Sequence, residues 1–119
     1  MIRQGDVYWL SLFGLGSEPA GRRPAVIVQA DHFNRSAITT AVIAAITSNL
    51  RLGDMPGNVR LRKGEAGLRQ ASVVNVSQLR TVDRSRLTER IGSLGEDRIT
   101  HILRGLALVL GIEIDENAA

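Results

Sequence analysis

Up to about residue 94, apolar residues stand in short runs or alternate with polar residues, which is the pattern of β-strands. In the first run, Val7 and Trp9 are expected on one face of a strand, and Tyr8 and Leu10 on the other. Glycine, proline, asparagine and aspartate separate the runs. The pattern predicts strands over 6–12, 25–30, 39–49, 59–63 and 72–82, a break in the last of these near Ser77, and a short strand at the end of 83–94.

Two residues mark the boundaries of the second predicted strand. Pro24 has no amide hydrogen, which suits the first residue of a strand, and the glycine-rich segment 13–23 before it is expected to be a loop. The polar segment 31–36, DHFNRS, is predicted to form a turn or a short helical piece that Asp31 can cap.

Residues 96–110 have the periodicity of one amphipathic helix. Ser93 and Glu96 match a capping box, and Gly111 fits the left-handed position that ends a helix. Gly105 weakens the middle of this helix by about 1 kcal/mol relative to alanine. The expected buried face consists of Ile99, Ile102, Leu103, Leu106, Ala107 and Leu110.

The order of these elements indicates the fold class. Several short strands followed by one terminal helix favour a mainly-β, α+β fold, in which the helix closes a small barrel or compact sheet. The chain of 119 residues has no internal repeat or low-complexity linker, so we expect a single domain over residues 1–119.

Charge is spread unevenly along the chain. Residues 1–90 carry thirteen basic and seven acidic residues, a net charge of +6, whereas residues 91–119 carry two and five, a net charge of −3. A basic body suggests a partner with phosphates or acidic side chains. All basic residues except Lys63 are arginine, whose planar fork suits phosphate, although a codon bias is the plainer explanation for most of them.

Several kinds of chemistry are absent from the sequence. Without cysteine there is no disulfide, thiol nucleophile or thiolate metal site, which fits a reducing compartment, and we expect a cytoplasmic protein. The longest apolar run, 41–46, is too short to span a membrane, and no signal peptide is expected. His32 and His101 are the only histidines, too few for a metal site, and nothing near either of them supports a Ser-His-Asp arrangement. No metal and no cofactor are therefore expected.

The remaining polar candidates are arginines and hydroxyl groups at predicted strand ends. Arg23 precedes one strand and Thr47 ends the next, so the two would meet if the strands ran side by side. A guanidinium and a hydroxyl would then bind a phosphate and its developing charge. Each has a structural alternative: Arg23 could pair with a carboxylate such as Glu18, and Thr47 could be an ordinary β-branched strand residue. Further candidates are Ser17, Glu18, Arg22, Ser48, Gln78 and Arg80.

The chain from residue 4 to about residue 112 resembles the MazF/PemK family of toxin endoribonucleases from bacterial toxin–antitoxin pairs. Six segments between residues 4 and 87 carry the resemblance. They are QGDVYWLSL, GSEPAGRRPAVIVQAD, NRS, AAITSN, PGNVRL and SVVNVSQLRTVDRSRL. The resemblance implies an SH3-like β-barrel of short, mostly antiparallel strands with a C-terminal helix packed on it. It also implies a homodimer whose RNA groove follows the subunit interface, and a cognate antitoxin as partner. The implied reaction is metal-independent cleavage of single-stranded RNA to 2′,3′-cyclic phosphate and 5′-hydroxyl ends.

The resemblance also assigns roles to individual residues. The family's catalytic arginine falls on Arg23 and its catalytic threonine on Thr47, while its "GSE" loop falls on residues 16–18, with Glu18 as a catalytic candidate. Pro19 departs from the family pattern, as does "SLFGL" before that loop, so base preference stays open. The RNA-binding candidates are Ser17, Arg22, Ser48, Asn49, Gln78 and Arg80.

The implied reaction needs no enzyme nucleophile, because the 2′-oxygen of the substrate attacks the neighbouring phosphorus. Arg23 and Thr47 would stabilise the phosphoryl oxygens. Arginine stays protonated and is a poor base, so either Glu18 takes the proton or the enzyme relies on positioning and charge stabilisation. Two other functions are kept as alternatives: a non-enzymatic toxin of the same barrel fold that binds DNA gyrase, and an inactive RNA-binding module.

Overall fold

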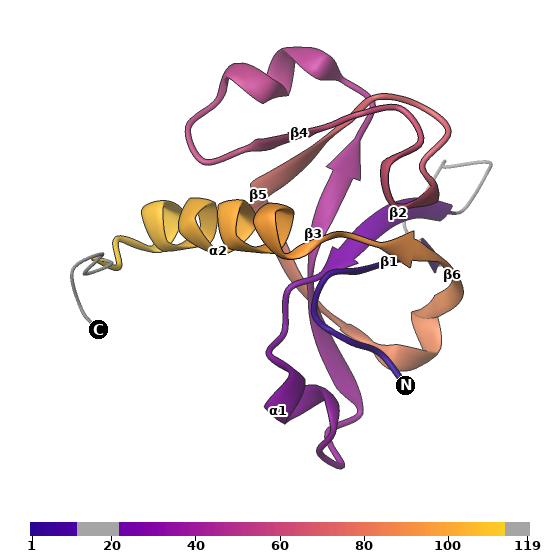
Figure 1. Ribbon diagram of the computed structural model, residues 1–119. Helices are drawn as coiled ribbons and strands as arrows, with labels where there is room; N and C mark the ends of the chain where they lie inside the picture. The colour runs from indigo at the N-terminus through magenta and orange to yellow at the C-terminus, as the bar shows by residue number, and fades with distance from the viewer. Residues whose placement is uncertain (12–21, 114–119) are drawn as a thin grey trace.

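The computed structural model describes residues 1–11 and 22–113, which form one curled antiparallel sheet with a long helix lying across it (Figure 1). The strands are β1 (Asp6–Ser11), β2 (Arg22–Ile27), β3 (Thr40–Thr47), β4 (Val59–Leu61), β5 (Ser72–Asp83) and β6 (Leu87–Ser93). Their order in the sheet is β4-β5-β3-β2-β1-β6. Helix α1 (Asp31–Asn34) is one short turn, and helix α2 (Glu96–Leu110) is the terminal helix. Three 3-10 turns complete the fold: η1 (Leu50–Asp54), η2 (Glu65–Gly67) and η3 (Arg84–Arg86).

This architecture confirms the mainly-β class with a C-terminal helix. The sheet is a half-barrel whose two edges are β4 and β6. All five runs predicted as strands contain one, and the expected short strand after residue 83 is β6, which follows the turn η3.

Two clusters of buried residues, one on each face of the sheet, form the core. On the face covered by α2, Val7 and Val26 pack with Leu106 of the helix. On the opposite face, Leu10 and Ile27 pack with their neighbours. The alternation predicted for the first strand is therefore confirmed, since Val7 and Leu10 belong to different clusters.

The predicted bounds of the second strand are wrong at both ends. Strand β2 begins two residues before Pro24, because it pairs with β1 as far back as Arg22 opposite Ser11. It ends at Ile27 rather than residue 30. Val28 and Gln29 both donate their amides to the same carbonyl oxygen, that of Val42 in β3, so the regular ladder stops there.

The predicted cap of the first helical turn is also wrong. Helix α1 has Ala30 as its N-cap, and Asp31 is its first residue. The Asp31 carboxylate instead accepts hydrogen bonds from the amide of Gln4 at 2.7 Å and from Nδ2 of Asn34 at 3.0 Å. These two bonds lower the pKa of Asp31, so the residue ties α1 to the N-terminal segment.

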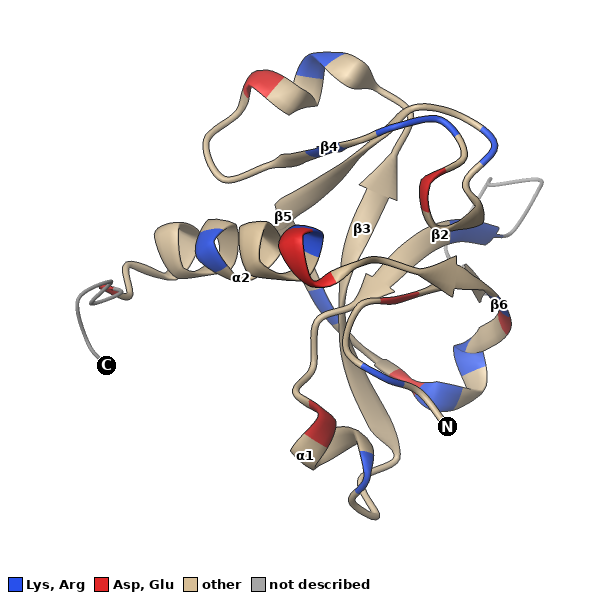
Figure 2. Cartoon of the chain, viewed as in Figure 1, with Lys and Arg blue, Asp and Glu red and all other residues tan. Residues whose placement is uncertain are grey.

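Helix α2 begins without the predicted capping box. Its N-cap is Gly95, and Ser93 lies two residues too early, where its hydroxyl donates to Asp6 at 2.7 Å. The acidic residues Glu96 and Asp97 occupy the first turn, where they complement the helix dipole (Figure 2). The predicted stop is confirmed, because Gly111 has a left-handed φ of 71°.

The buried face of α2 is shorter than its periodicity predicts. Ile102, Leu106 and Ala107 are buried, but Leu103 is 39% exposed and Leu110 is 58% exposed. The last turns of the helix extend past the sheet, so nothing in the described chain covers them (Figure 1).

Gly105 has a steric role that the sequence did not reveal. A Cβ atom at this position would overlap the carbonyl oxygen of Gly57, and a Cβ at Gly57 would lie 3.0 Å from the Gly105 carbonyl oxygen. The backbone of the loop before β4 thus lies directly against α2. The lost helix propensity at Gly105 is the cost of this close approach.

We predict that Gly105→Ala lowers the free energy of unfolding by about 1–3 kcal/mol, because overpacking against a backbone carbonyl outweighs the gain in helix propensity. Urea denaturation measures the change. The control is Gly95→Ala at the N-cap of this helix, where nothing lies within 4 Å of the added methyl group and only the capping preference changes, by about 1 kcal/mol or less. A stabilised Gly105→Ala variant would contradict this account.

Candidate active site

The site lies where the pairing between β2 and β3 ends. The last pair in this ladder is Ala25 with Ala45. Pro24 precedes it and has no amide hydrogen with which to extend the ladder. Continued by two residues, the same register places Arg23 opposite Thr47, with both side chains on the same face of the sheet. Two candidates from separate parts of the sequence are thereby brought to one place.

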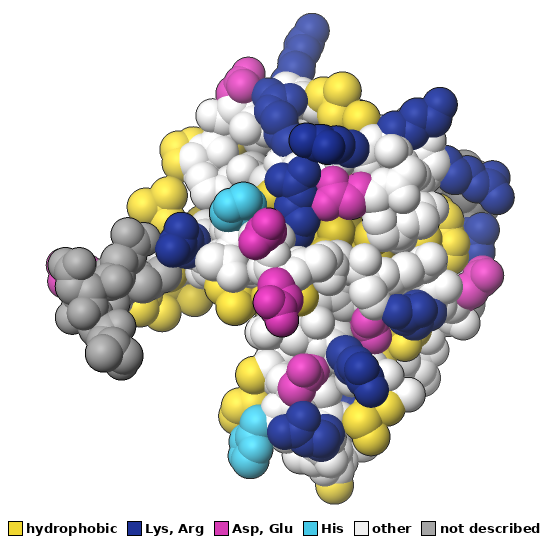
Figure 3. Space-filling model, in the orientation of Figure 1, with side chains coloured by type: hydrophobic (Ala, Val, Ile, Leu, Met, Phe, Trp, Pro, Cys, Tyr) yellow, Lys and Arg dark blue, Asp and Glu magenta, His cyan; other side chains and the backbone are white. Residues whose placement is uncertain are grey.

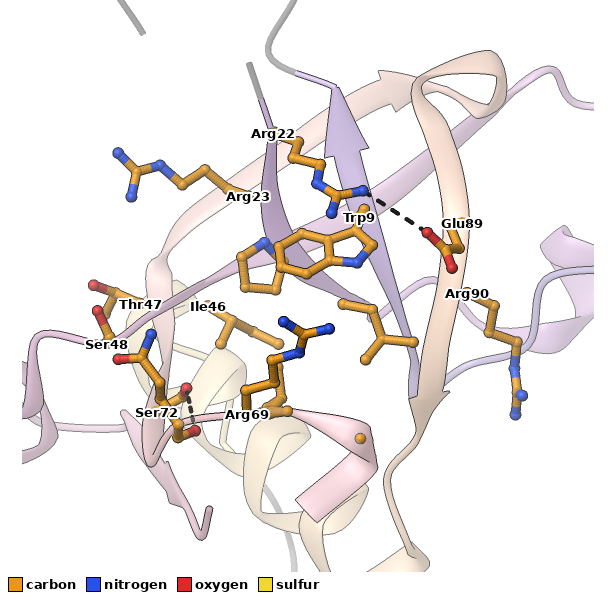
Figure 4. A pocket seen from close by; sticks show the side chains of 15 residues that line it. Trp9, Arg22, Arg23, Ile46, Thr47, Ser48, Arg69, Ser72, Glu89 and Arg90 are labelled. Atoms are coloured by element: carbon orange, nitrogen blue, oxygen red, sulfur yellow. Dashed lines mark hydrogen bonds and ion pairs between the residues drawn. The ribbon is translucent and has the colours of Figure 1, made fainter. Parts of the chain in front are cut away.

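Two pockets, each of about 600 Å³, open beside this point. Arg23, Pro24, Ile46 and Thr47 line both of them. The Trp9 pocket is completed chiefly by Trp9, Arg22, Ser48, Arg69, Gln70 and Glu89 (Figure 4). The Gln78 pocket is completed by Leu10, Ala25, Ile43, Ala45, Gln78 and Arg80. Arg23 and Thr47 therefore stand on the ridge between the two pockets.

The hydroxyl group of Thr47 is oriented by the turn that follows β3. Its oxygen accepts a hydrogen bond from the amide of Asn49 at 3.1 Å. The hydroxyl hydrogen is left to be donated to another group, such as a phosphoryl oxygen. Asn49 itself lines neither pocket, and its side chain accepts from the amide of Arg51 at the start of η1.

The two adjacent arginines lie in different surroundings. The guanidinium of Arg22 stacks on the Trp9 ring, 4.3 Å from its centroid, and its Nη1 lies 3.8 Å from Oε2 of Glu89. Figure 4 shows the Arg22 and Arg23 side chains pointing apart, with Arg23 directed away from Trp9. Arg22 is thus held at the rim of the Trp9 pocket.

A bulge in β5 directs Gln78 into the second pocket. Ala44 of β3 pairs with Leu79, but the next residue, Ala45, pairs with Asn75, so three residues of β5 have no partner in β3. This is the break predicted near Ser77. A bulge re-aims side chains, and Gln78 lines the Gln78 pocket together with Arg80.

The predicted loop residues Ser17 and Glu18, and the unusual Pro19, lie outside the described residues. The described ends on either side, Ser11 and Arg22, pair with each other next to the Trp9 pocket.

Arg69 is a site residue to which the sequence reasoning gave no role. It belongs to the segment between η2 and β5 and extends into the Trp9 pocket (Figure 4). No motif or periodicity marks it, because its place depends on how that segment folds over the sheet. Trp9, which the alternation of the first strand places on one face with Val7, is half-buried and lines the pocket.

The segment that carries Arg69, from η2 to the start of β5, is anchored to both β6 and α2. A Cβ atom at Gly67 would lie 2.6 Å from the carbonyl oxygen of Ile91, so η2 lies directly on β6. Glu65 accepts from Nε of Arg98 in α2 at 2.7 Å. Burial acts to raise the pKa of Glu65, but the hydrogen bonds from Arg98 and from the Arg62 amide outweigh it and hold that pKa below its usual value.

Residues 1–11 and 22–113 contain neither a cluster of metal ligands nor a membrane-spanning helix. No three His, Asp or Glu side chains there come together as a metal site would require. No helix in these segments has the length and hydropathy needed to cross a membrane.

The half-barrel with a terminal helix, and an arginine and a threonine where two strands part between two pockets, define a class of small mainly-β proteins with a surface site at the end of a strand ladder. The family described as PemK-like, MazF-like toxin of type II toxin–antitoxin system matches residues 3–110. This chain belongs to that family.

Individual relatives agree with this assignment. The Mycobacterium tuberculosis protein named Endoribonuclease MazF6 is 39% identical over 113 residues, which cover 94% of this chain and 99% of the relative. A mycobacterial endoribonuclease solved with its cognate antitoxin superimposes with a TM-score of 0.78 at 21% identity, covering 97% of this chain and 100% of that one. For the MazE–MazF structure from Deinococcus radiodurans, the TM-score is 0.74 at 24% identity, over 94% of this chain and 97% of that one.

We predict that Glu65→Gln lowers the free energy of unfolding at pH 7 by about 1.5–3 kcal/mol, because Arg98 loses a charged partner. A lowered pKa stabilises the fold above the ordinary glutamate value of about 4.3, and this stabilisation is lost as the pH falls below it. The difference from wild type should therefore shrink between pH 7 and pH 3, as measured by urea denaturation.

The control is Asp54→Asn, which breaks an exposed pair with Arg60 and should change stability by no more than about 1 kcal/mol. Equal effects of the two variants, or a difference for Glu65→Gln that does not depend on pH, would contradict the prediction.

Proposed function

We propose that this protein is an endoribonuclease toxin that cuts single-stranded RNA without a metal ion and leaves 2′,3′-cyclic phosphate and 5′-hydroxyl ends. Its membership of the toxin family and its 39% identity to a protein named as an endoribonuclease support this. The observation that carries the proposal is the position of Arg23 and Thr47, which line both pockets at the end of the β2–β3 ladder.

In the proposed reaction, the 2′-oxygen attacks the adjacent phosphorus in line as the bond to the 5′-oxygen breaks. Negative charge develops on the phosphoryl oxygens. The Arg23 guanidinium binds two of them, and the Thr47 hydroxyl, whose oxygen already accepts from Asn49, donates to one. DNA is not a substrate, because it lacks the 2′-hydroxyl.

Proton transfer completes the reaction. The 2′-hydroxyl loses its proton, and the departing 5′-oxygen takes a proton from water. Glu18 is the proposed acceptor of the 2′-proton, because it is the carboxylate nearest to Arg23 in the preceding segment. If Glu18 has no such role, water takes the proton and rate enhancement comes from positioning and charge stabilisation alone.

The remaining candidates are proposed to hold the RNA on either side of the cut. Arg22 and Ser48 line the Trp9 pocket, and Gln78 and Arg80 line the Gln78 pocket. Ser17 and Asn49 are kept as proposed RNA contacts from the flanking loops. Figure 3 shows basic side chains gathered over β4 and the segment leading to β5, and such a surface attracts a phosphate backbone in a salt-dependent way.

We propose a cognate antitoxin as the second partner, since related toxins have been solved with theirs. An acidic antitoxin segment lying across the basic surface would block RNA by charge and by occupancy. Because the substrate is cellular RNA, we place the protein in the cytoplasm.

A homodimer is proposed from two apolar surfaces that the described residues leave uncovered. Strand β4 pairs with β5 only as far as Val74, so the second half of β5 has no neighbour on that side among the described strands, and Leu79 there is 37% exposed. The last turns of α2 expose Leu108 and Leu110. Pairing of two copies would cover both surfaces and bring the Gln78 pockets near the interface.

We predict that Arg23→Ala lowers kcat/KM for RNA cleavage by about 10²–10³-fold, since it removes a donor to the developing charge. The isosteric Thr47→Val should lower it by at least tenfold for the same reason. Cleavage of a long mixed-sequence RNA in excess EDTA, with analysis of the ends, measures the effect.

Arg35→Ala is the matched control, because it removes an exposed arginine near α1 that lines neither pocket. Full activity of a folded Arg23→Ala variant would remove Arg23 from its role, and a need for added metal would overturn the mechanism. Growth arrest with intact RNA and a captured gyrase complex would favour the non-enzymatic alternative.

We predict that Leu110→Glu weakens the homodimer at least tenfold, because it places a charge in the proposed apolar interface. Sedimentation equilibrium measures the dissociation constant. Thr100→Glu adds the same charge to the exposed first half of α2 and should leave the dimer intact. A wild-type protein that stays monomeric at high concentration would refute the dimer, and equal effects of the two variants would refute this interface.

A further inference from the structure

The floor of the Trp9 pocket is a row of apolar side chains that crosses three strands. Trp9 of β1 pairs with Pro24 of β2, and the register of β2 with β3 leads on to Ile46. All three line the pocket. Because paired residues of a sheet point to the same side, the Trp9 ring continues one flat apolar surface.

Cationic side chains surround this floor. Arg22 stands over the Trp9 ring and Arg69 extends in from the opposite wall (Figure 4). Arg23, on the shared ridge, is the residue proposed to bind the scissile phosphate. A flat apolar surface beside several guanidinium groups suits a ligand that combines a planar ring with phosphates.

The stacked Arg22 shows that the exposed face of Trp9 accepts a flat, delocalised group. The guanidinium carbon lies over the ring, 4.3 Å from its centroid, in the place that a stacked base would take. Its second contact, with Glu89, is 3.8 Å long, and the side chains of Arg22 and Glu89 are 51% and 68% exposed. A pair so exposed contributes little, so Arg22 is easily displaced.

We propose that Trp9 is a nucleobase-stacking residue and that the Arg22 guanidinium covers its ring until a base displaces it. A base next to the scissile phosphate stacks on Trp9 in place of the Arg22 guanidinium. Arg22 then leaves Glu89 and binds a backbone phosphate of the same strand. Trp9 and Arg22 thereby act in RNA selection, while Arg23 and Thr47 act in the reaction. This inference rests on the proposed nuclease function, because it takes RNA as the ligand.

The first test uses the fact that Trp9 is the only tryptophan in the chain. The intact protein is titrated with nucleoside 5′-monophosphates at constant ionic strength while tryptophan fluorescence is recorded, with free N-acetyltryptophanamide correcting for absorption. Ribose 5-phosphate carries the same phosphate without a base. We expect saturable quenching by the nucleotides and none by ribose 5-phosphate. No quenching, or equal quenching by both, would overturn the proposal.

The second test addresses the displacement of Arg22 from the Trp9 ring. Glu89→Gln releases Arg22 from its partner and should tighten nucleoside monophosphate binding about twofold to fivefold. Asp83→Asn removes one negative charge at the end of β5, away from both pockets, and should leave binding unchanged. Equal tightening in the two variants would mean that only net charge matters and would remove the role of Glu89 and Arg22.

The third test measures RNA selection. Trp9→Leu should lower kcat/KM for single-stranded RNA by roughly fivefold to 100-fold, mostly through KM, and should change the distribution of cut sites, whereas Trp9→Phe should retain stacking and both properties. Circular dichroism confirms that each variant is folded. Unchanged KM and cut sites in Trp9→Leu would overturn the proposal.

The outcomes separate this inference from the nuclease proposal. Quenching by nucleotides in a protein that cuts no RNA would retain the base site and refute the nuclease. Cleavage without quenching, and with an unaffected Trp9→Leu variant, would do the reverse. Stronger quenching by an acidic peptide containing phenylalanine than by any nucleotide would assign the pocket to a peptide and overturn base stacking.

Discussion

The site depends on the early end of the β2–β3 ladder at Ala25. The first three residues of β2, Arg22 to Pro24, pair with β1 but not with β3. Because Pro24 cannot donate a hydrogen bond to extend the ladder, the sheet opens between β2 and β3. The opening exposes Arg23 and Thr47 on their respective strands and creates the pockets on either side. A fully paired sheet would leave these side chains on a continuous surface with no space for a phosphate between the strands.

The alternation of side chains along β2 places the two adjacent arginines in different surroundings. One residue apart on an extended strand, Arg22 and Arg23 point to opposite faces, so the first meets Trp9 and the second stands on the ridge with Thr47. The sequence predicts Arg23 as the phosphate ligand and Arg22 only as one of several RNA-binding candidates. The contact of Arg22 with the Trp9 ring gives it a specific environment that the sequence did not predict.

Patterns within single segments predicted most of the fold, and contacts between distant segments account for the errors. The strands and the terminal helix were predictable because their periodicities are local. Ser93 was misjudged as a cap because its hydroxyl donates to Asp6, 87 residues away. Leu110 was misjudged as buried because periodicity shows which side of a helix is apolar but not where the sheet beneath it ends. Arg23 and Thr47 were predictable from their strand positions and the family resemblance. Arg69 was not, because the contacts of Gly67 and Glu65 determine its position.

The contact between Gly57 and Gly105 restricts which amino acids the fold tolerates at these two positions. The obstacle at each position is backbone, the carbonyl oxygen of the other glycine, so no change of a neighbouring side chain can make room for a Cβ atom. Substitutions at the two positions therefore cannot compensate for each other: a small residue at one site does not make room for a larger residue at the other. Gly105 is closed to every other amino acid for as long as the loop before β4 keeps its path. At Gly57 a side chain needs a shift of a few tenths of an ångström and is strained by the φ of 82°.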